Sequence, residues 1–178
     1  MVAADAATGR VVAGLPLAGP PTHLVLAPGA GDGRPRLYAV EALGPAAGPD
    51  DPPRGAGAGG RLLGLDPATL EVRSAQPLTR APLALAVAPD GARAYALVGR
   101  GDPAHGDALV ELDLMAGTER RFAALPGGAH ALAVAGDRVY AAAPTAHVLW
   151  ALDRRAGHLV ATLPVGPGPA DLLLVPPR

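Results

Sequence analysis

The chain has 178 residues, of which 49% are hydrophobic, and its formal net charge at pH 7 is −1. This hydrophobic content excludes an intrinsically disordered chain, and the length suffices to bury the core of an ordinary domain. All 15 basic residues are arginines that form no basic block, so we expect no nucleic-acid partner. The absence of cysteine excludes disulfides and thiolate metal sites.

Short apolar runs separated by turn residues fill the chain. Most of the 24 glycines and 21 prolines stand at the ends of these runs. This arrangement argues against long helices, because an interior proline costs a helix about 3 kcal/mol. No run reaches the roughly 18 apolar residues of a transmembrane helix, and residues 1–20 lack the features of a signal peptide.

An aspartate-led turn recurs four times along the chain. The copies begin at Asp5, Asp66, Asp113 and Asp153, so the interval shortens from 61 to 47 to 40 residues. In three copies a glycine follows four residues later, where it can adopt the positive φ that closes a hairpin. Leu70 replaces this glycine in the second copy, so we expect that turn to differ slightly.

Between successive turns the sequence predicts a cycle of four short strands. In the clearest copy, the strands span residues 83–87, 94–98, 108–112 and about 118–125. Val110 and Leu112 alternate with Glu111, which is the period-2 pattern of a half-buried strand. Four-strand cycles repeated about every 40–45 residues are typical of β-propeller blades.

The predicted fold is therefore all-β: a β-propeller of four-stranded antiparallel blades, with three complete blades and partial blades at both ends. The chain begins in a third strand and stops at Val175 after another first strand, so we expect residues 1–178 to form a single partial domain of a larger propeller. Two insertions lengthen the link between second and third strands. They are a loop at 43–60, predicted to be flexible, and a shorter loop at 99–107.

Parts of the repeat resemble a known family. Residues 153–166 with 169–176 resemble the repeat of YVTN-type β-propellers, which are close kin of NHL propellers, and residues 5–17 and 87–96 match other parts of that consensus. The resemblance mildly favours an extracytoplasmic location. The pyrroloquinoline-quinone-type propeller is the nearest alternative. Its repeat places a tryptophan shortly after the turn glycine, whereas Trp150 here precedes the turn.

Two polar residues take equivalent positions in different repeats. His23 and Asp171 each lie five residues before the proline that closes a first strand, while Ala84 and Ala131 take the matching places in the other two blades. His130 lies one residue before Ala131. The first strand of a propeller blade is innermost, so these residues are expected at one end of the central channel.

We therefore predict a partial ligand-contact surface formed by His23, His130 and Asp171, with no catalytic residue, metal or cofactor assigned. The competing interpretation is that these polar side chains only bond the backbones of neighbouring blades. The three tyrosines at one strand position, Tyr38, Tyr95 and Tyr140, and the single tryptophan are expected in the core between blades.

The leading functional hypothesis is a non-enzymatic module that presents loops and a channel mouth to a protein or small ligand. Ser74, the single serine, lacks a Gly-x-Ser-x-Gly context, and the absence of lysine excludes a P-loop. The alternative is a propeller enzyme of lactonase or lyase type, with its active site at the channel end. Exposed apolar edges at Val2, Val11, Val12 and 172–174 also predict self-association through open blades.

Overall fold

The computed structural model describes residues 1–19, 21–29, 33–43, 59–80, 82–99, 106–166, 168–169 and 171–172. Its elements in chain order are β1 (Val2–Ala4), β2 (Val11–Gly14), β3 (Pro21–Pro28), β4 (Pro35–Leu43), β5 (Gly59–Leu65), β6 (Val72–Leu78), β7 (Ala84–Val87), β8 (Arg93–Val98), β9 (Asp107–Asp113), β10 (Thr118–Leu125), β11 (Ala131–Ala135), β12 (Arg138–Ala143), the 3₁₀ turn η1 (Pro144–Ala146), β13 (Val148–Asp153) and β14 (Leu159–Pro164). Within these ranges no helix is long and apolar enough to cross a bilayer.

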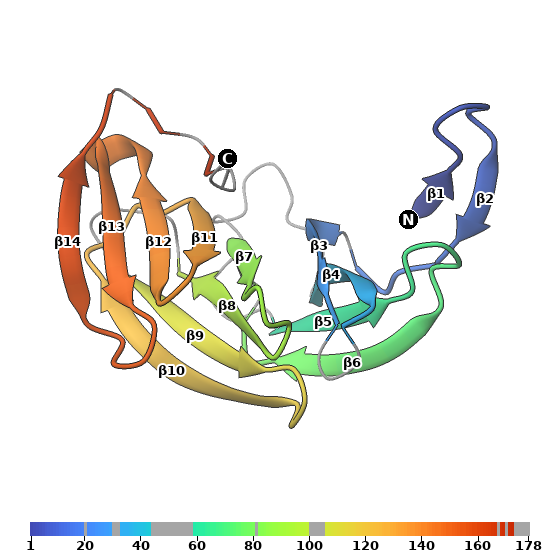
Figure 1. Cartoon of the computed structure of the whole chain (residues 1–178), viewed down its shortest axis with the longest axis horizontal. Coiled ribbons are helices and arrows are strands. Elements are labelled where there is room, and N and C mark those ends of the chain that lie inside the picture. Colours follow the sequence, from blue (N-terminus) through green and yellow to red (C-terminus); the bar gives the residue numbers. More distant parts are fainter. Residues whose placement is uncertain are drawn as a thin grey trace.

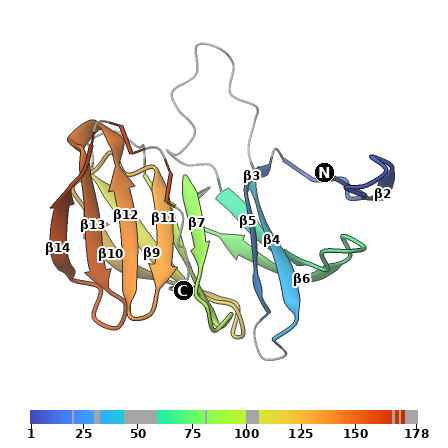
Figure 2. The ribbon, with the colours of Figure 1, turned by 45° about the horizontal axis from the view of Figure 1, so that its top comes forward.

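Three four-stranded antiparallel sheets and one two-stranded hairpin make up the fold. We call β3–β6 blade 1, β7–β10 blade 2 and β11–β14 blade 3; β1 and β2 form the hairpin. The sheets follow one another along an open arc, with β3, β7 and β11 on its inner side (Figures 1 and 2). This confirms the all-β fold with three complete blades and a partial blade before them. The final strand, predicted to end at Val175, falls largely outside the described residues.

Strand register confirms that the blades are repeats of one unit. The inner strands pair His23 with Val40, Ala84 with Leu97, and Ala131 with Ala142. Each of these partners lies two residues after the tyrosine of its own blade. The equivalence of positions 23, 84 and 131, expected from their spacing, is therefore present in the hydrogen-bonded ladders.

The apolar core lies in layers between successive blades. Along β8, Ala94 and Ala96 face the core shared with blade 1, whereas Tyr95 and Leu97 face the core shared with blade 3. Trp150 belongs to the second of these layers and is 4% exposed. The predicted inter-blade position is confirmed for Trp150, Tyr38 and Tyr95. Tyr140 is only half-buried, on a blade with no described sheet after it.

Coverage of both sheet faces overturns the half-buried prediction for β9, the third strand of blade 2. In β9, Val110 and Leu112 belong to the core facing blade 1, while Glu111 points to the other face and is still only 3% exposed. A blade between two neighbours has no solvated face, so alternation along its strands selects a neighbour instead of separating core from water.

The aspartate-led turns share one hydrogen-bonding pattern. The Asp113 Oδ1 accepts the backbone N–H groups of Met115 at 3.0 Å and Ala116 at 2.8 Å. Leu70 was expected to alter its turn, but it keeps the same backbone: its φ is 58°, and its N–H donates to the Asp66 carbonyl at 2.9 Å. Its side chain is buried, and this burial offsets the strain of a left-handed leucine.

Both predicted insertions fall mainly outside the described residues. β4 continues to Leu43 and β5 begins at Gly59, so the ladder reaches into the ends of the first insertion. Likewise, β9 begins at Asp107, the last residue of the second. Residues 44–58 and 100–105 lie outside the described part of the chain.

Candidate functional sites

A hollow on the inner side of the arc contains all three sequence-predicted site residues. It has a volume of about 740 Å³, and the inner strands of all three blades line it with mainly apolar side chains. His23 enters its wall from β3, His130 from the residue before β11, and Asp171 from the segment after blade 3. We call this the channel hollow. Three distant parts of the sequence therefore contribute polar groups to one space.

His23 is the most distinctive group in the channel hollow. Its side chain is half-buried, and its Nδ1 atom is buried without a hydrogen-bond partner among the described residues. This finding does not support the interpretation that the Nδ1 atom bonds a neighbouring backbone. Burial lowers the pKa of His23, which favours the neutral imidazole near pH 7. A neutral ring presents one donor and one acceptor to a ligand.

The other two predicted residues are more exposed. The backbone N–H of His130 donates to the Ala142 carbonyl at 2.9 Å and extends the β11–β12 ladder. The Asp171 Oδ1 accepts the N–H of Leu172 at 2.7 Å. Ala84 takes the matching position on β7, between His23 and His130, and adds no polar group. In the described part of the chain, no group of three or more His, Asp or Glu side chains is placed to hold a metal ion.

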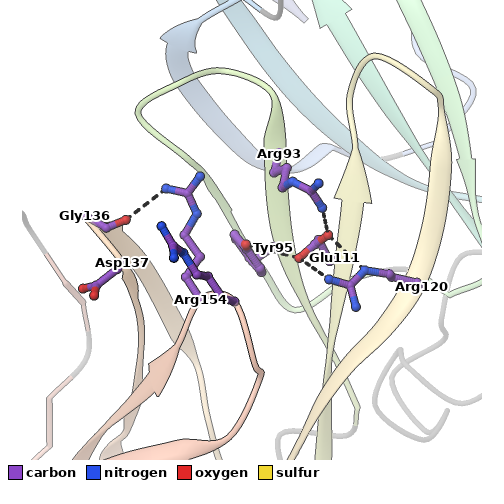
Figure 3. A pocket seen from close by; sticks show the side chains of 8 residues that line it. Arg93, Tyr95, Glu111, Arg120, Gly136, Asp137 and Arg154 are labelled. Atoms are coloured by element: carbon purple, nitrogen blue, oxygen red, sulfur yellow. Dashed lines mark hydrogen bonds and ion pairs between the residues drawn. The ribbon is translucent and has the colours of Figure 1, made fainter.

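A second hollow, between blades 2 and 3, is built from charged side chains (Figure 3). Its volume is about 520 Å³, and its lining residues define what we call the arginine pocket: Arg93, Tyr95, Glu111, Arg120, Gly136, Asp137, Arg154 and Arg155. His130 precedes β11 and Gly136 follows it, so His130 and the arginine pocket lie towards opposite ends of the inner strand of blade 3.

Glu111 is the centre of the arginine pocket. Its carboxylate accepts two bonds from Arg120, Nε to Oε1 at 3.0 Å and Nη2 to Oε2 at 2.9 Å. Arg93 also pairs with Oε1, and the Tyr95 hydroxyl donates to Oε2 at 3.3 Å. Burial, followed by the negative charge of Glu111, raises the pKa of the Tyr95 phenol, which therefore remains a donor.

Blade 3 supplies the opposite wall through the turn between β13 and β14. Arg154 pairs with Asp90 of blade 2. Its Nη1 also donates to the Gly136 carbonyl at 2.9 Å (Figure 3). The ion pair crosses the blade boundary and fixes the Arg154 guanidinium at the rim. Arg155 is exposed, and its side chain has no hydrogen bond or ion pair within the described ranges.

The pair of charged residues at Glu111 and Arg120 occurs in only one of the three blades. The residue paired with the blade tyrosine on the third strand is Glu111 in blade 2, but Gly64 in blade 1 and Ala151 in blade 3. On the fourth strand, Arg120 in blade 2 corresponds to Ser74 and Ala161. This site was not predicted from the sequence. A signal was present in the sequence, because charged residues replace small ones at these two repeat positions in blade 2 alone.

The sequence matches no protein-family model and no curated protein. Solved structures do match. Saccharomyces cerevisiae Sqt1 superposes with a TM-score of 0.67 at 16% identity, over 99% of this chain and 45% of that one. Kuenenia stuttgartiensis hydrazine synthase gives 0.58 at 18% identity, over 85% and 38%. A candidate 6-phosphogluconolactonase from Bacteroides fragilis gives 0.58 at 16% identity, over 97% and 49%.

The fold is that of a β-propeller. Identities of 16–18% show the fold alone, since one propeller architecture carries many unrelated functions. This propeller chain spans less than half the length of each of these three structures.

Proposed function

We propose that this chain is part of a YVTN-type β-propeller that acts as a binding module, with the channel hollow as its contact surface for a small polar ligand. The carrying observation is that His23, His130 and Asp171 line one space, although they come from separate segments. Apolar walls with a few convergent polar groups are the usual composition of a small-molecule site.

The chemistry of these three groups defines the ligand class. A neutral imidazole accepts from a hydroxyl or donates to a carboxylate, depending on its tautomer. Because the Nδ1 atom of His23 is buried, a ligand in the hollow would bind this ring through Nε2. Asp171 accepts from hydroxyls. A polyhydroxy carboxylate offers both complements, so gluconate is a suitable probe of the channel hollow.

A second candidate function is an enzyme of lactonase or lyase type at the same hollow. The observation that favours it is His23, because a partly buried imidazole with a lowered pKa stays neutral near pH 7 and can act as a general base. Glucono-δ-lactone is the corresponding substrate probe. The two functions therefore share a site and differ in whether the probe is turned over.

NMR spectra of protein labelled with ¹⁵N in its histidine rings separate the two candidates. We expect millimolar gluconate to shift the ring signals of His23 and His130, and to leave unchanged those of His158, which lies on the outer β13–β14 turn. His23→Ala should abolish the shift at His130, whereas His158→Ala should not. Spectra unchanged by gluconate would contradict binding at this hollow.

Lactone hydrolysis is followed in the same samples. The binding module should hydrolyse glucono-δ-lactone at the rate of the buffer alone. Hydrolysis above that rate that disappears in His23→Ala but persists in His158→Ala would favour the enzyme.

A further inference from the structure

We propose that the arginine pocket is a second binding site, which takes a small organic oxyanion with at least two negative charges, such as a phosphate ester or a polycarboxylate. This site is separate from the channel hollow, and the proposal does not depend on the function proposed there. The volume of about 520 Å³ lies within the range of small-molecule pockets, so it accommodates an organic body as well as the charged group.

Charge selects the ligand class. Four arginines against one glutamate and one aspartate give the lining a net formal charge of +2. The carboxylates are already partnered, because Glu111 is held by Arg93 and Arg120, and the Asp137 Oδ2 lies 3.3 Å from the Arg138 Nη1. Positive charge is therefore in excess where a ligand would sit. Guanidinium groups bind carboxylates and phosphates through paired, charge-assisted hydrogen bonds.

The guanidinium groups of Arg93 and Arg120 are held in place by Glu111 and still have free N–H donors. Arg120 gives two of its five N–H donors to Glu111, so three remain. Its side chain is 58% exposed and that of Arg93 is 43% exposed, so both present donors to the hollow. Anchoring by a buried carboxylate removes much of the side-chain entropy that a ligand would otherwise have to freeze. Glu111 thus orders the site without needing to touch the ligand.

Arg155 makes no side-chain hydrogen bond or ion pair that would give it a structural role in the described part of the chain. Its side chain lines the pocket, yet within the described part of the chain it bonds to nothing. Removing it should leave the fold intact and weaken anion binding. Both walls of the pocket belong to complete blades, so the described lining comes from two neighbouring blades of this chain.

Isothermal titration calorimetry of the full chain tests the proposal, with inorganic phosphate and citrate as anionic probes and glucose as the neutral one. We expect saturable binding of at least one anion, weakened by added NaCl because charge drives it, and no heat from glucose. Phosphate binding without citrate binding would identify a phosphate ester as the ligand; the reverse would identify a polycarboxylate. Binding of neither anion would overturn the proposal.

Three variants locate the binding. Arg155→Ala and Arg120→Ala should each lower the affinity for the anion by about 10- to 100-fold, the range for losing a charge-assisted hydrogen bond. The matched control is Arg121→Ala, which removes the same charge from the exposed neighbour of Arg120 outside the pocket lining. It should change the affinity less than threefold or so. Equal losses in Arg155→Ala and Arg121→Ala would overturn the assignment, and Arg155→Ala keeps the test valid if Arg120→Ala does not fold.

Discussion

At the scale of single residues, the buried carboxylates carry information that the repeat does not. Glu111 and Glu41 are each almost fully buried, and each is neutralised by arginine. Glu41 also accepts the backbone N–H of Ala18 at 3.0 Å, which holds the segment after β2 against blade 1. The apolar residues around them repeat in every blade, whereas these two carboxylates do not. The apolar residues at repeated positions therefore form the core of each blade, whereas the charged sites are formed by residues that differ between blades.

Replacing the central carboxylate should destabilise the protein. In Glu111→Gln, both Arg93 and Arg120 lose their charged partner, but their partial exposure lets water compensate. We expect the free energy of unfolding to fall by about 2 kcal/mol, measured by urea denaturation. Glu71→Gln breaks the solvent-exposed pair with Arg73 and is the control, with a loss of about 0.5 kcal/mol or less. Equal losses would mean that burial of Glu111 contributes nothing.

His23 should make stability depend on pH in a defined window. Burial lowers its folded-state pKa below the ordinary value of 6.5. Above pH 6.5 the ring is neutral in both states, and as the pH falls below that value the unfolded chain binds the proton first. Stability should therefore decrease from about pH 7 to pH 5, and His23→Gln should flatten the slope. The same substitution at exposed His158 should leave it unchanged; a steep slope that survives in His23→Gln would refute the assignment.

At the scale of elements, two equivalent turn glycines face different surroundings. Gly117 and Gly157 have φ values of 66° and 72°, so both hold a conformation that disfavours other residues. A Cβ on Gly117 would meet nothing within 4 Å, whereas one on Gly157 would lie 2.5 Å from the carbonyl oxygen of Phe122 in blade 2. The β13–β14 turn therefore also forms a close contact between blades.

The two alanine substitutions separate backbone strain from this contact. Gly117→Ala should cost about 1 kcal/mol, the penalty for a left-handed residue with a Cβ. Gly157→Ala should cost about 2–3 kcal/mol, because a backbone carbonyl must also move. Thermal melts of both variants measure the difference. Indistinguishable melting temperatures would show that the turn of blade 3 has room at the boundary.

The strands and turns could be predicted from the sequence because the pattern that determines them is local. Aspartate-led turns and short apolar runs set the hairpins, and the spacing from His23 to its closing proline correctly predicted its equivalence to Ala84 in the next blade. The burial of Glu111 could not be predicted, because alternation along β9 does not show whether a sheet packs against one neighbouring sheet or two. The arginine pocket was harder still. It needs Arg154 beside Asp90, a contact set by how blades dock and not by either turn alone.

At the scale of the whole molecule, apolar surface remains open along the arc. Leu26 on the inner strand β3 is 66% exposed, and Val11 and Val12 on the β1–β2 hairpin are similarly exposed. β14 at the opposite end of the arc exposes Leu159 and Leu163. Each blade contacts mainly its neighbours, so among the residues that the structure describes no further sheet covers the two terminal faces of the array.

We therefore propose that the isolated 178-residue chain associates with further copies of itself through these edges. Size-exclusion chromatography with light scattering should show a mass that rises with protein concentration. Val12→Lys on the open hairpin should lower the association, whereas Val139→Ala, in the interior, should lower stability without a specific effect on mass. A monomer at all concentrations, with a sharp melt above about 60 °C, would contradict this expectation.

The order of the strands also bears on how the protein is made. In every sheet, hydrogen-bonded neighbours are consecutive in the sequence, so each blade can complete its ladder before the next leaves the ribosome. Such local pairing favours rapid folding in the direction of synthesis. Asp90, however, can form its ion pair only after Arg154 has been synthesised, 64 residues later. Formation of that ion pair marks a separate, later event: the docking of one finished blade against another.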